Sequence, residues 1–284
     1  SGSGCRARTT RFGRHGSAPE NWTAVSPNGD KVIFVSNQNG AARQIWIADP
    51  DGQNQRQLTS FPEGSFAVRP LWSPDGSSII FDATVGGVSS IYTLNVDSGL
   101  PQKILGDGSS ELAAPCWSND GRSIYYSKRT DGQWQLWKAS VDGSGEIQIT
   151  KNGGYEAHVS SDGKYIFYNK GGYGALGVFR LPTDGASEEE KVLDLYQVES
   201  LGEWALTDQG IYFLHRNEVF EVPTKQPRIR FLNFSTQQIS DVSPLPLQPL
   251  GNPGLSVSPD GAWLYYSIND RTDIDIMLVE NVNW

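Results

Sequence analysis

Two carboxylates, an imidazole and a guanidinium are the side chains of this sequence best suited to chemistry. Glu156 and His158 lie two residues apart, Glu203 follows 47 residues after Glu156, and Arg69 precedes them. Two carboxylates and an imidazole could together hold a divalent metal ion. The same groups could instead form ion pairs around Arg69 that only stabilise the fold. The second interpretation is favoured, because a Glu-x-His pair on a strand specifies no further histidine.

Other catalytic patterns are missing from the sequence. Its three histidines, His15, His158 and His215, lie far apart, which does not support a histidine-rich metal centre. No Gly-x-Ser-x-Gly nucleophile elbow occurs, and no glycine-rich phosphate loop precedes a helical pattern. We therefore expect no catalytic residue, no metal and no cofactor. A metal-dependent lyase or lactonase using Glu156, His158 and Glu203 remains the enzymatic alternative.

Composition limits the partners. The 284 residues include 23 Lys and Arg against 32 Asp and Glu, a net charge of -9, so extended binding to a nucleic-acid backbone is not expected. No run approaches ~18 consecutive apolar residues, so we expect no membrane span in this chain.

The two cysteines make no disulfide framework. Cys116 lies within an apolar strand pattern and is predicted to be a small buried hydrophobe. Residues 1–5 are interpreted as an expression scar.

A four-residue signature, Ser-Pro-Asp-Gly or a near-copy of it, recurs six times along the chain. The six copies begin at Ser26, Ser73, Ser118, Ser160, Thr207 and Ser258, with spacings of 47, 45, 42, 47 and 51 residues. Pro presets φ, Asp can accept hydrogen bonds from its own backbone, and Gly tolerates a left-handed conformation. The signature therefore predicts a turn that belongs to the fold and not to a catalytic site.

Each signature is flanked by short apolar runs separated by Gly, Asp and Asn, with four runs in most units. Four antiparallel strands repeated about every 45 residues are typical of a β-propeller blade. We expect an all-β, six-bladed β-propeller that forms a single domain over residues 6–284, with blades starting near 20, 67, 112, 154, 201 and 252.

Two units depart from the pattern. The sixth ends after its third strand, and we predict that the N-terminal segment from Ala7 to Phe12 supplies the missing strand and covers the open sheet edge. In the fifth, we take the run from Ile229 to Phe234 as the third strand and the run from Gln237 to Val242 as the fourth. The earlier run from Val219 to Val222 is then an insertion.

The first residues of the innermost strands would crowd one mouth of a propeller channel, where such folds usually bind partners. Counting back from the signatures places a candidate ligand or partner site there. Its members are Trp22, Arg69, Glu156, His158, Glu203 and Trp204. Loops at the same mouth carry aromatic residues, among them Phe61, Phe66 and Trp134, and aromatic residues beside Arg suit protein or peptide contact.

The repeat resembles that of TolB-type propellers. The resemblance rests on the tryptophan, turn and strand pattern, which is clearest at Leu71-Trp-Ser-Pro-Asp-Gly76 and Cys116-Trp-Ser-Asn-Asp-Gly121. It covers nearly the whole chain, although Val25, Val159, Leu206 and Val257 stand where the tryptophan is expected. A closer likeness is to the C-terminal propeller of CadC-like bacterial transcriptional regulators. It rests on Gln44-Ile-Trp-Ile-Ala-Asp49, Arg56-Gln-Leu-Thr-Ser-Phe61, Lys151-Asn-Gly-Gly154 and Asp275-Ile-Met-Leu-Val-Glu-Asn281.

These resemblances imply a function without catalysis. The CadC-like one implies the sensor or protein-interaction domain of a larger regulator, whose DNA-binding winged helix has no counterpart in this sequence. The TolB-like alternative implies a periplasmic scaffold that binds a protein or peptide at the channel mouth. An extracytoplasmic location is favoured. The gating propeller of a serine peptidase is less favoured, because the repeat leaves no room for a hydrolase domain.

Overall fold

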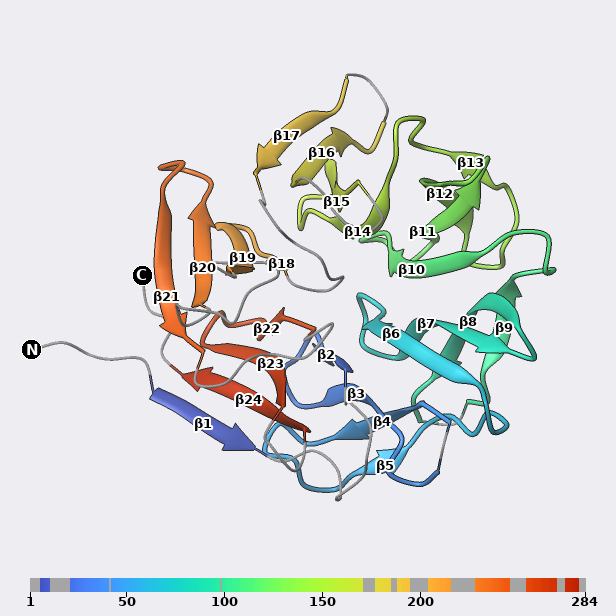
Figure 1. Ribbon diagram of the computed structural model, residues 1–284, viewed down its shortest axis with the longest axis horizontal. Helices are drawn as coiled ribbons and strands as arrows, with labels where there is room; N and C mark the ends of the chain where they lie inside the picture. Colours follow the sequence, from blue (N-terminus) through green and yellow to red (C-terminus); the bar gives the residue numbers. More distant parts are fainter. Residues whose placement is uncertain are drawn as a thin grey trace, which may run out of the picture. The chain divides into compact units, whose positions relative to one another are not determined.

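Strands make up the regular structure of the part of the chain that the computed structural model describes. The described residues are 6–10, 21–40, 42–97, 99–170, 177–184, 188–194, 204–215, 228–245, 254–269 and 274–280. They contain 24 strands arranged as four-stranded antiparallel sheets (Figure 1). Within these ranges no helix is long and apolar enough to cross a membrane.

The chain divides into two compact units, each containing three sheets. The first unit comprises residues 1–40, 45–58 and 200–284. Its strands are β2 (Asn21–Val25), β3 (Val32–Ser36), β4 (Gln44–Ala48) and β5 (Arg56–Gln57); β18 (Trp204–Leu206), β19 (Gly210–His215), β20 (Arg228–Asn233) and β21 (Ile239–Pro244); and β22 (Ser256–Val257), β23 (Trp263–Asn269), β24 (Ile274–Glu280) and β1 (Arg6–Thr10).

The second unit comprises residues 41–44 and 59–199. Its strands are β6 (Phe66–Trp72), β7 (Ser78–Val85), β8 (Val88–Asn95) and β9 (Gln102–Leu105); β10 (Leu112–Trp117), β11 (Ser123–Thr130), β12 (Gln133–Ser140) and β13 (Ile147–Gln148); and β14 (Tyr155–Val159), β15 (Tyr165–Asn169), β16 (Val178–Pro182) and β17 (Glu190–Leu193). In every sheet of this unit, consecutive strands are neighbours.

The two chain ends share one composite sheet, in the order β1-β24-β23-β22. Strand β1 pairs antiparallel with β24, from Arg6 opposite Glu280 to Thr10 opposite Ile276, and Figure 1 shows the two side by side. The prediction that the N-terminal segment supplies this strand is confirmed, although the strand lies slightly earlier than expected. The structure therefore has five blades formed by consecutive strands and not the six expected, because the remaining sheet is drawn from both ends of the chain.

The fifth repeat of the sequence also follows the sequence interpretation in part. Strand β20 pairs with β19 along its whole length, which confirms the run beginning near Ile229 as the third strand. The outer strand β21 begins at Ile239, two residues later than predicted, because residues 234–236 form the turn and Gln237 has a left-handed φ of 56°. The expected insertion from Val219 to Val222 lies outside the described residues.

The signature residues form a hydrogen-bonded turn between the first two strands of each sheet. In one of them, Ser73 Oγ donates to Asp75 Oδ1 over 2.6 Å, and the same carboxylate oxygen accepts the Ser77 amide at 3.0 Å. Gly76 completes the turn with a φ of 72°, which disfavours residues with a β-carbon. Hydrogen bonding by the serines lowers the pKa of Asp75, Asp120, Asp162 and Asp260. The aspartates thus stabilise turns, as the sequence predicts.

Adjacent turns also contact one another. A β-carbon on Gly121 would lie 3.9 Å from Pro74, the second residue of the preceding turn. Asn119, at the same place in the next turn, donates to the carbonyl oxygens of Ser160 and Ser161 at 2.7 Å each. The second signature residue therefore joins one sheet to the next as well as shaping its own turn.

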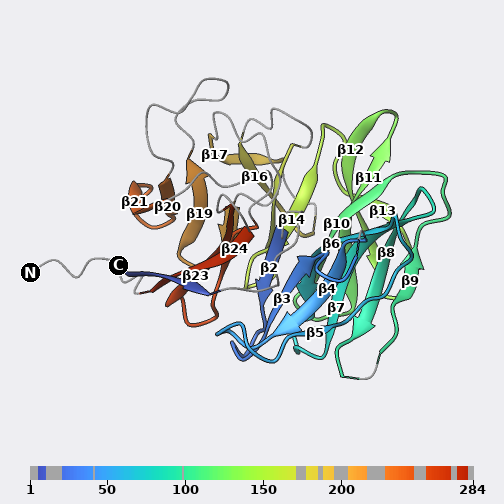
Figure 2. The ribbon, with the colours of Figure 1, turned by 60° about the horizontal axis from the view of Figure 1, so that its bottom comes forward.

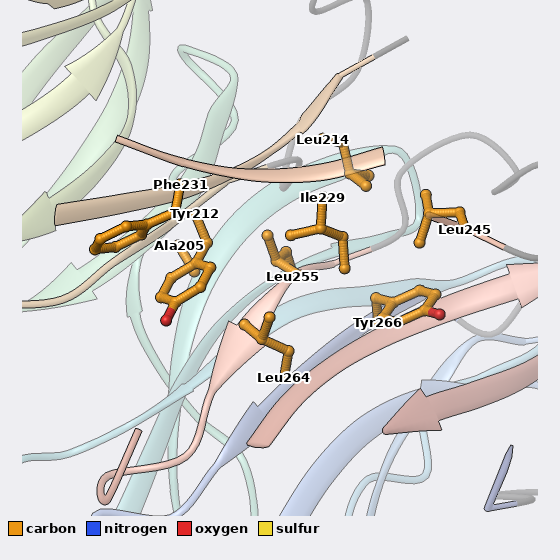
Figure 3. Packing of buried hydrophobic residues seen from close by; sticks show 9 residues of the cluster. All are labelled: Ala205, Tyr212, Leu214, Ile229, Phe231, Leu245, Leu255, Leu264 and Tyr266. Atoms are coloured by element: carbon orange, nitrogen blue, oxygen red, sulfur yellow. The ribbon is translucent and has the colours of Figure 1, made fainter. Parts of the chain in front are cut away.

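Apolar side chains between neighbouring sheets form the core of each unit. In the first unit, Tyr212, Ile229 and Phe231 of one sheet pack against Leu264 and Tyr266 of the composite sheet (Figure 3). In the second, Tyr126 packs against side chains of the β6–β9 sheet and Tyr125 against side chains of the β14–β17 sheet. Sheet β10–β13 therefore lies between these two neighbours (Figure 2). The two faces of a strand are each buried against a neighbouring sheet, which explains why the strands of the repeat are continuous apolar runs.

Deleting residues 1–10 should destabilise the protein, because β24 would lose its partner and become an exposed sheet edge. We expect the melting temperature to fall by several degrees, at about 2–4 °C for each kcal/mol of stability lost. Thermal unfolding followed by circular dichroism measures the effect, with deletion of residues 1–5 as the control. Equal melting temperatures for the two truncations would contradict a stabilising role for β1.

Candidate functional site

A left-handed residue interrupts the innermost strand at the same place in successive sheets. Trp22, Arg69, Ala114 and Glu156 have φ angles of 55°, 52°, 48° and 48°, and Gly254 holds the equivalent place in the composite sheet with 57°. At the first four, the pairing with the second strand shifts register, which marks a β-bulge. Such a conformation costs on the order of 1–3 kcal/mol in a residue other than Gly. Its recurrence shows that it belongs to the repeat and is not peculiar to one site.

Polar side chains of the preceding sheet hold two of these bulges in place. The Ala114 amide donates to Asp82 Oδ1 over 3.2 Å, and the Glu156 amide donates to Ser127 Oγ over 3.2 Å. Asp82 and Ser127 are buried at equivalent positions of β7 and β11, nine residues after the signature serines. A buried amide needs such a partner, so each second strand both supports the next sheet and fixes where its first strand begins.

Arg69 forms a buried ion pair with Asp82. Its Nε and Nη2 atoms donate to the two carboxylate oxygens over 2.8 and 2.6 Å, and only 15% and 7% of the two side chains are exposed. Burial acts to lower the pKa of the Arg69 guanidinium, but Asp82, with Tyr155 and Glu156 nearby, raises it above its ordinary value. The guanidinium also lies 5.9 Å from the centre of the Tyr155 ring. Sequence reasoning missed Asp82, although it is the one charge in an apolar strand run.

Glu156 belongs to the same polar network. Asn169 Nδ2 donates to Glu156 Oε2 over 3.2 Å, and both residues are buried. The carboxylate is near enough to Arg69 to contribute to its raised pKa. Of the two predicted arrangements, the described residues show an ion pair for Arg69, with Asp82, and a hydrogen bond for Glu156, with Asn169.

His158 is partly buried, and desolvation lowers its pKa to about 4, so its imidazole is neutral at pH 7. Glu203, the third member of the expected metal-binding set, lies outside the described residues. Among the residues that are described, no group of three or more His, Cys, Asp and Glu side chains is placed to hold a metal ion. Because Glu203 is not among the described residues, the arrangement of the three-residue set stays a prediction.

The two tryptophans of the predicted site are buried in the first unit. Trp22 lies on β2, where its backbone is so close to Gly254 that a β-carbon there would lie 2.5 Å from the Trp22 Cα. Trp204, the first residue of β18, is only 1% exposed. Both side chains are thus buried and lack the exposure of contact residues.

The aromatic residues of the loops differ in exposure. Phe61 packs against Phe81 and Tyr92, with ring centres 6.2 and 5.2 Å away. Trp134 lies edge-on to Tyr155, with ring centres 5.1 Å apart. Phe66 is 46% exposed at the start of β6. Two of these loop aromatic residues are thus packed on neighbouring rings, and the third is exposed to solvent.

Gln44 and Gln135 hold the connections that lead from one sheet to the next. Gln44 Oε1 accepts Thr59 Oγ1 at 2.8 Å and the Phe61 amide at 3.1 Å. Gln135 Oε1 accepts Thr150 Oγ1 at 2.9 Å and the Gly153 amide at 3.1 Å. The Gln-Ile-Trp and Leu-Thr segments behind the resemblance to CadC-like regulators thus include residues with a structural role in the repeat. These segments therefore indicate the fold and do not indicate a particular partner.

Cys116 is buried, as predicted, and burial raises the pKa of its thiol to about 12. A thiol that stays protonated at neutral pH is a poor nucleophile. The side chain packs among Tyr125, Leu136 and Ile166 between two sheets. The structure thus assigns Cys116 to the core.

Comparison with known proteins points to one family. The model of the TolB β-propeller domain matches residues 2–115 and 25–217. An "Uncharacterized peptidase YuxL" of Bacillus subtilis is 41% identical over 66 residues, which are 23% of this chain and 10% of that protein. A "Protein TolB homolog" of Protochlamydia amoebophila is 32% identical over 80 residues, 26% of this chain and 17% of that protein.

The crystal structure of TolB from Acinetobacter baumannii superposes with a TM-score of 0.68 at 17% identity, over 92% of this chain and 63% of that one. At this identity the likeness shows the fold alone. The chain thus matches less than two thirds of the length of each of these proteins. None of the three matches points to a CadC-like regulator, and that link stays a prediction.

Replacing Arg69 with Met should cost about 3–5 kcal/mol of unfolding free energy, because it leaves the Asp82 carboxylate buried without its counter-ion. Adding Asp82→Asn should recover part of the loss, since the amide oxygen can still accept the Ala114 N–H. Urea unfolding of the wild type and the single and double variants measures both effects. A double variant no more stable than Arg69→Met would show that the unpaired charge is not the cause.

Loss of stability in mild acid should depend on His158. Its pKa in the folded protein, about 4, is below the ordinary value of 6.5, so its contribution is complete above pH 6.5 and is lost as the pH falls towards 4. By pH 5 the loss amounts to about 2 kcal/mol. His158→Gln should reduce the difference in unfolding free energy between pH 7 and pH 5 by about that amount, whereas His215→Gln serves as control. An unchanged difference in the first variant would contradict the assignment.

Proposed function

The chain belongs to the TolB β-propeller domain family, and from this premise we propose that it is a non-enzymatic protein-interaction scaffold that works outside the cytoplasm. We further propose that the composite sheet acts as the sixth blade of a single propeller domain over residues 6–284. The partner is a protein or peptide, bound at the end of the sheets where the innermost strands begin. The residues proposed for this site are those that the repeat pattern of the sequence selects: Trp22, Arg69, Glu156, His158, Glu203 and Trp204.

One observation carries the proposal: the buried charged groups described at this end have partners inside the protein. Arg69 forms an ion pair with Asp82, and Glu156 accepts a hydrogen bond from Asn169. A catalytic acid or base must reach its substrate, whereas these groups brace the strands behind the loops. The residues left to meet a partner are exposed side chains of the loops such as Phe66, and aromatic and Arg side chains are the types enriched at protein interfaces.

The rigidity of the support favours binding as well. Hydrogen bonds between sheets fix the bulges at Ala114 and Glu156, and Gln44 fixes the connection that carries Phe61. A surface that is already ordered loses little conformational entropy when a partner docks. The protein named as a peptidase matches over 66 residues only, 10% of its length, so we transfer no catalytic residue from it to this chain.

A photo-crosslinking amino acid distinguishes the two ends of the sheets in the native organism. We expect p-benzoylphenylalanine at Trp134, in the β11–β12 hairpin beside Tyr155, to form an adduct with a discrete protein in the extracytoplasmic fraction. The same substitution at Leu100, which is 82% exposed in the turn between β8 and β9, serves as control, because that turn lies at the opposite end of its sheet.

Adducts formed equally at both positions, or only at Leu100, would refute docking at the innermost-strand end. Recovery of the chain in the cytoplasm would refute the location. Recovery there together with DNA would favour a regulator of the CadC-like kind.

A further inference from the structure

Arg43 is held against the start of β6 by its backbone. Its amide donates to the Ser65 carbonyl over 3.2 Å, and its own carbonyl accepts the Ala67 amide at 3.0 Å, which makes an isolated parallel bridge with Phe66. The next residue, Gln44, is anchored to Phe61 and Thr59. The position of Arg43 is therefore set by backbone hydrogen bonds, independently of its charge.

The side chain of Arg43 lies over an exposed aromatic ring. Its guanidinium carbon is 5.7 Å from the centre of the Phe66 ring, and Phe66 is one of the few large apolar side chains among the described residues with nearly half of its surface exposed, at 46%. Phe61 from the same connection is instead packed on Phe81 and Tyr92. Phe61 thus packs on neighbouring rings. Phe66 is instead exposed to solvent, beside the Arg43 guanidinium.

Arg43 also differs from other arginines in its charge balance. Arg69 pairs with Asp82, Arg129 with Glu111 and Arg180 with Glu190. No carboxylate of the described residues lies within ion-pairing distance of Arg43, although its side chain is half-buried. Burial lowers the pKa of the guanidinium, but an arginine remains charged at neutral pH. A partly desolvated cation with no counter-ion among the described residues favours an incoming anion.

We propose that Arg43 and Phe66 form a recognition site for an acidic side chain flanked by an apolar residue on a partner polypeptide. The planar guanidinium presents donors in the geometry of a carboxylate, and the ring of Phe66 offers the neighbouring apolar residue a surface to cover. The net charge of -9 opposes a polyanionic partner and leaves a single local carboxylate as the fitting ligand. The inference rests on the proposed function and specifies one anchor of its interface.

The test uses a positional-scanning hexapeptide library applied to the immobilised full chain. We expect selection of Asp or Glu next to Leu, Ile or Phe, with affinity that falls as salt is raised. Arg43→Gln should weaken a selected peptide about tenfold to a hundredfold, the worth of a charge-assisted hydrogen bond. Arg43→Lys, which keeps the charge without the planar fork, should fall between, and Phe66→Ala should reduce the selection of the apolar neighbour.

Arg122→Gln is the matched control, because Arg122 is an exposed arginine of the second unit near a signature turn, at the other end of the sheets. Circular dichroism of each variant verifies folding. Selection without a carboxylate, selection unaffected by Arg43→Gln, or no selection at all would overturn the inference. If adducts at Trp134 persist in that case, the interaction scaffold stands and only this anchor is wrong; loss of both would refute the proposed function itself.

Discussion

A left-handed bulge at the start of the innermost strands is the constraint on which the rest of the structure depends. Its conformation is unfavourable for Trp22, Arg69, Ala114 and Glu156 alike. In the second unit it is maintained because the bulged amides of Ala114 and Glu156 find acceptors on the preceding sheet. A sheet with this geometry is complete only when its neighbour is present, so folding of one repeat is coupled to folding of the next.

The same coupling is repeated at the other end of the sheets and in the core between them. Signature turns contact the turns that follow them, as Asn119 does with Ser160 and Ser161. Aromatic side chains such as Tyr126 and Tyr212 fill the space between facing sheets. Directional hydrogen bonds thus fix register at both ends, while apolar burial, which is non-directional, supplies most of the stabilisation.

These structural roles explain why we assign no catalytic role to the charged residues at the starts of the innermost strands. Arg69 and Asp82 satisfy each other, and Asp82 also serves the amide of Ala114. Groups committed in this way are poorly placed to exchange protons or bind ligands. The recognition site that we propose instead uses side chains whose backbone is fixed by hydrogen bonds, as is that of Arg43 beside Phe66.

The sequence by itself determined the repeat, the turn chemistry and the course of most strands, because these depend on local spacing of Gly, Asp and apolar residues. It also predicted the N-terminal strand, since an unpaired edge after the last repeat requires a partner. Only the tertiary structure decided which charges pair. Asp82 is thirteen residues from Arg69 and thirty-two from Ala114, and no local pattern joins them. Likewise, the exposure of Phe66 and the partial burial of Phe61 depend on which side chains of other strands reach them, which composition and period do not specify.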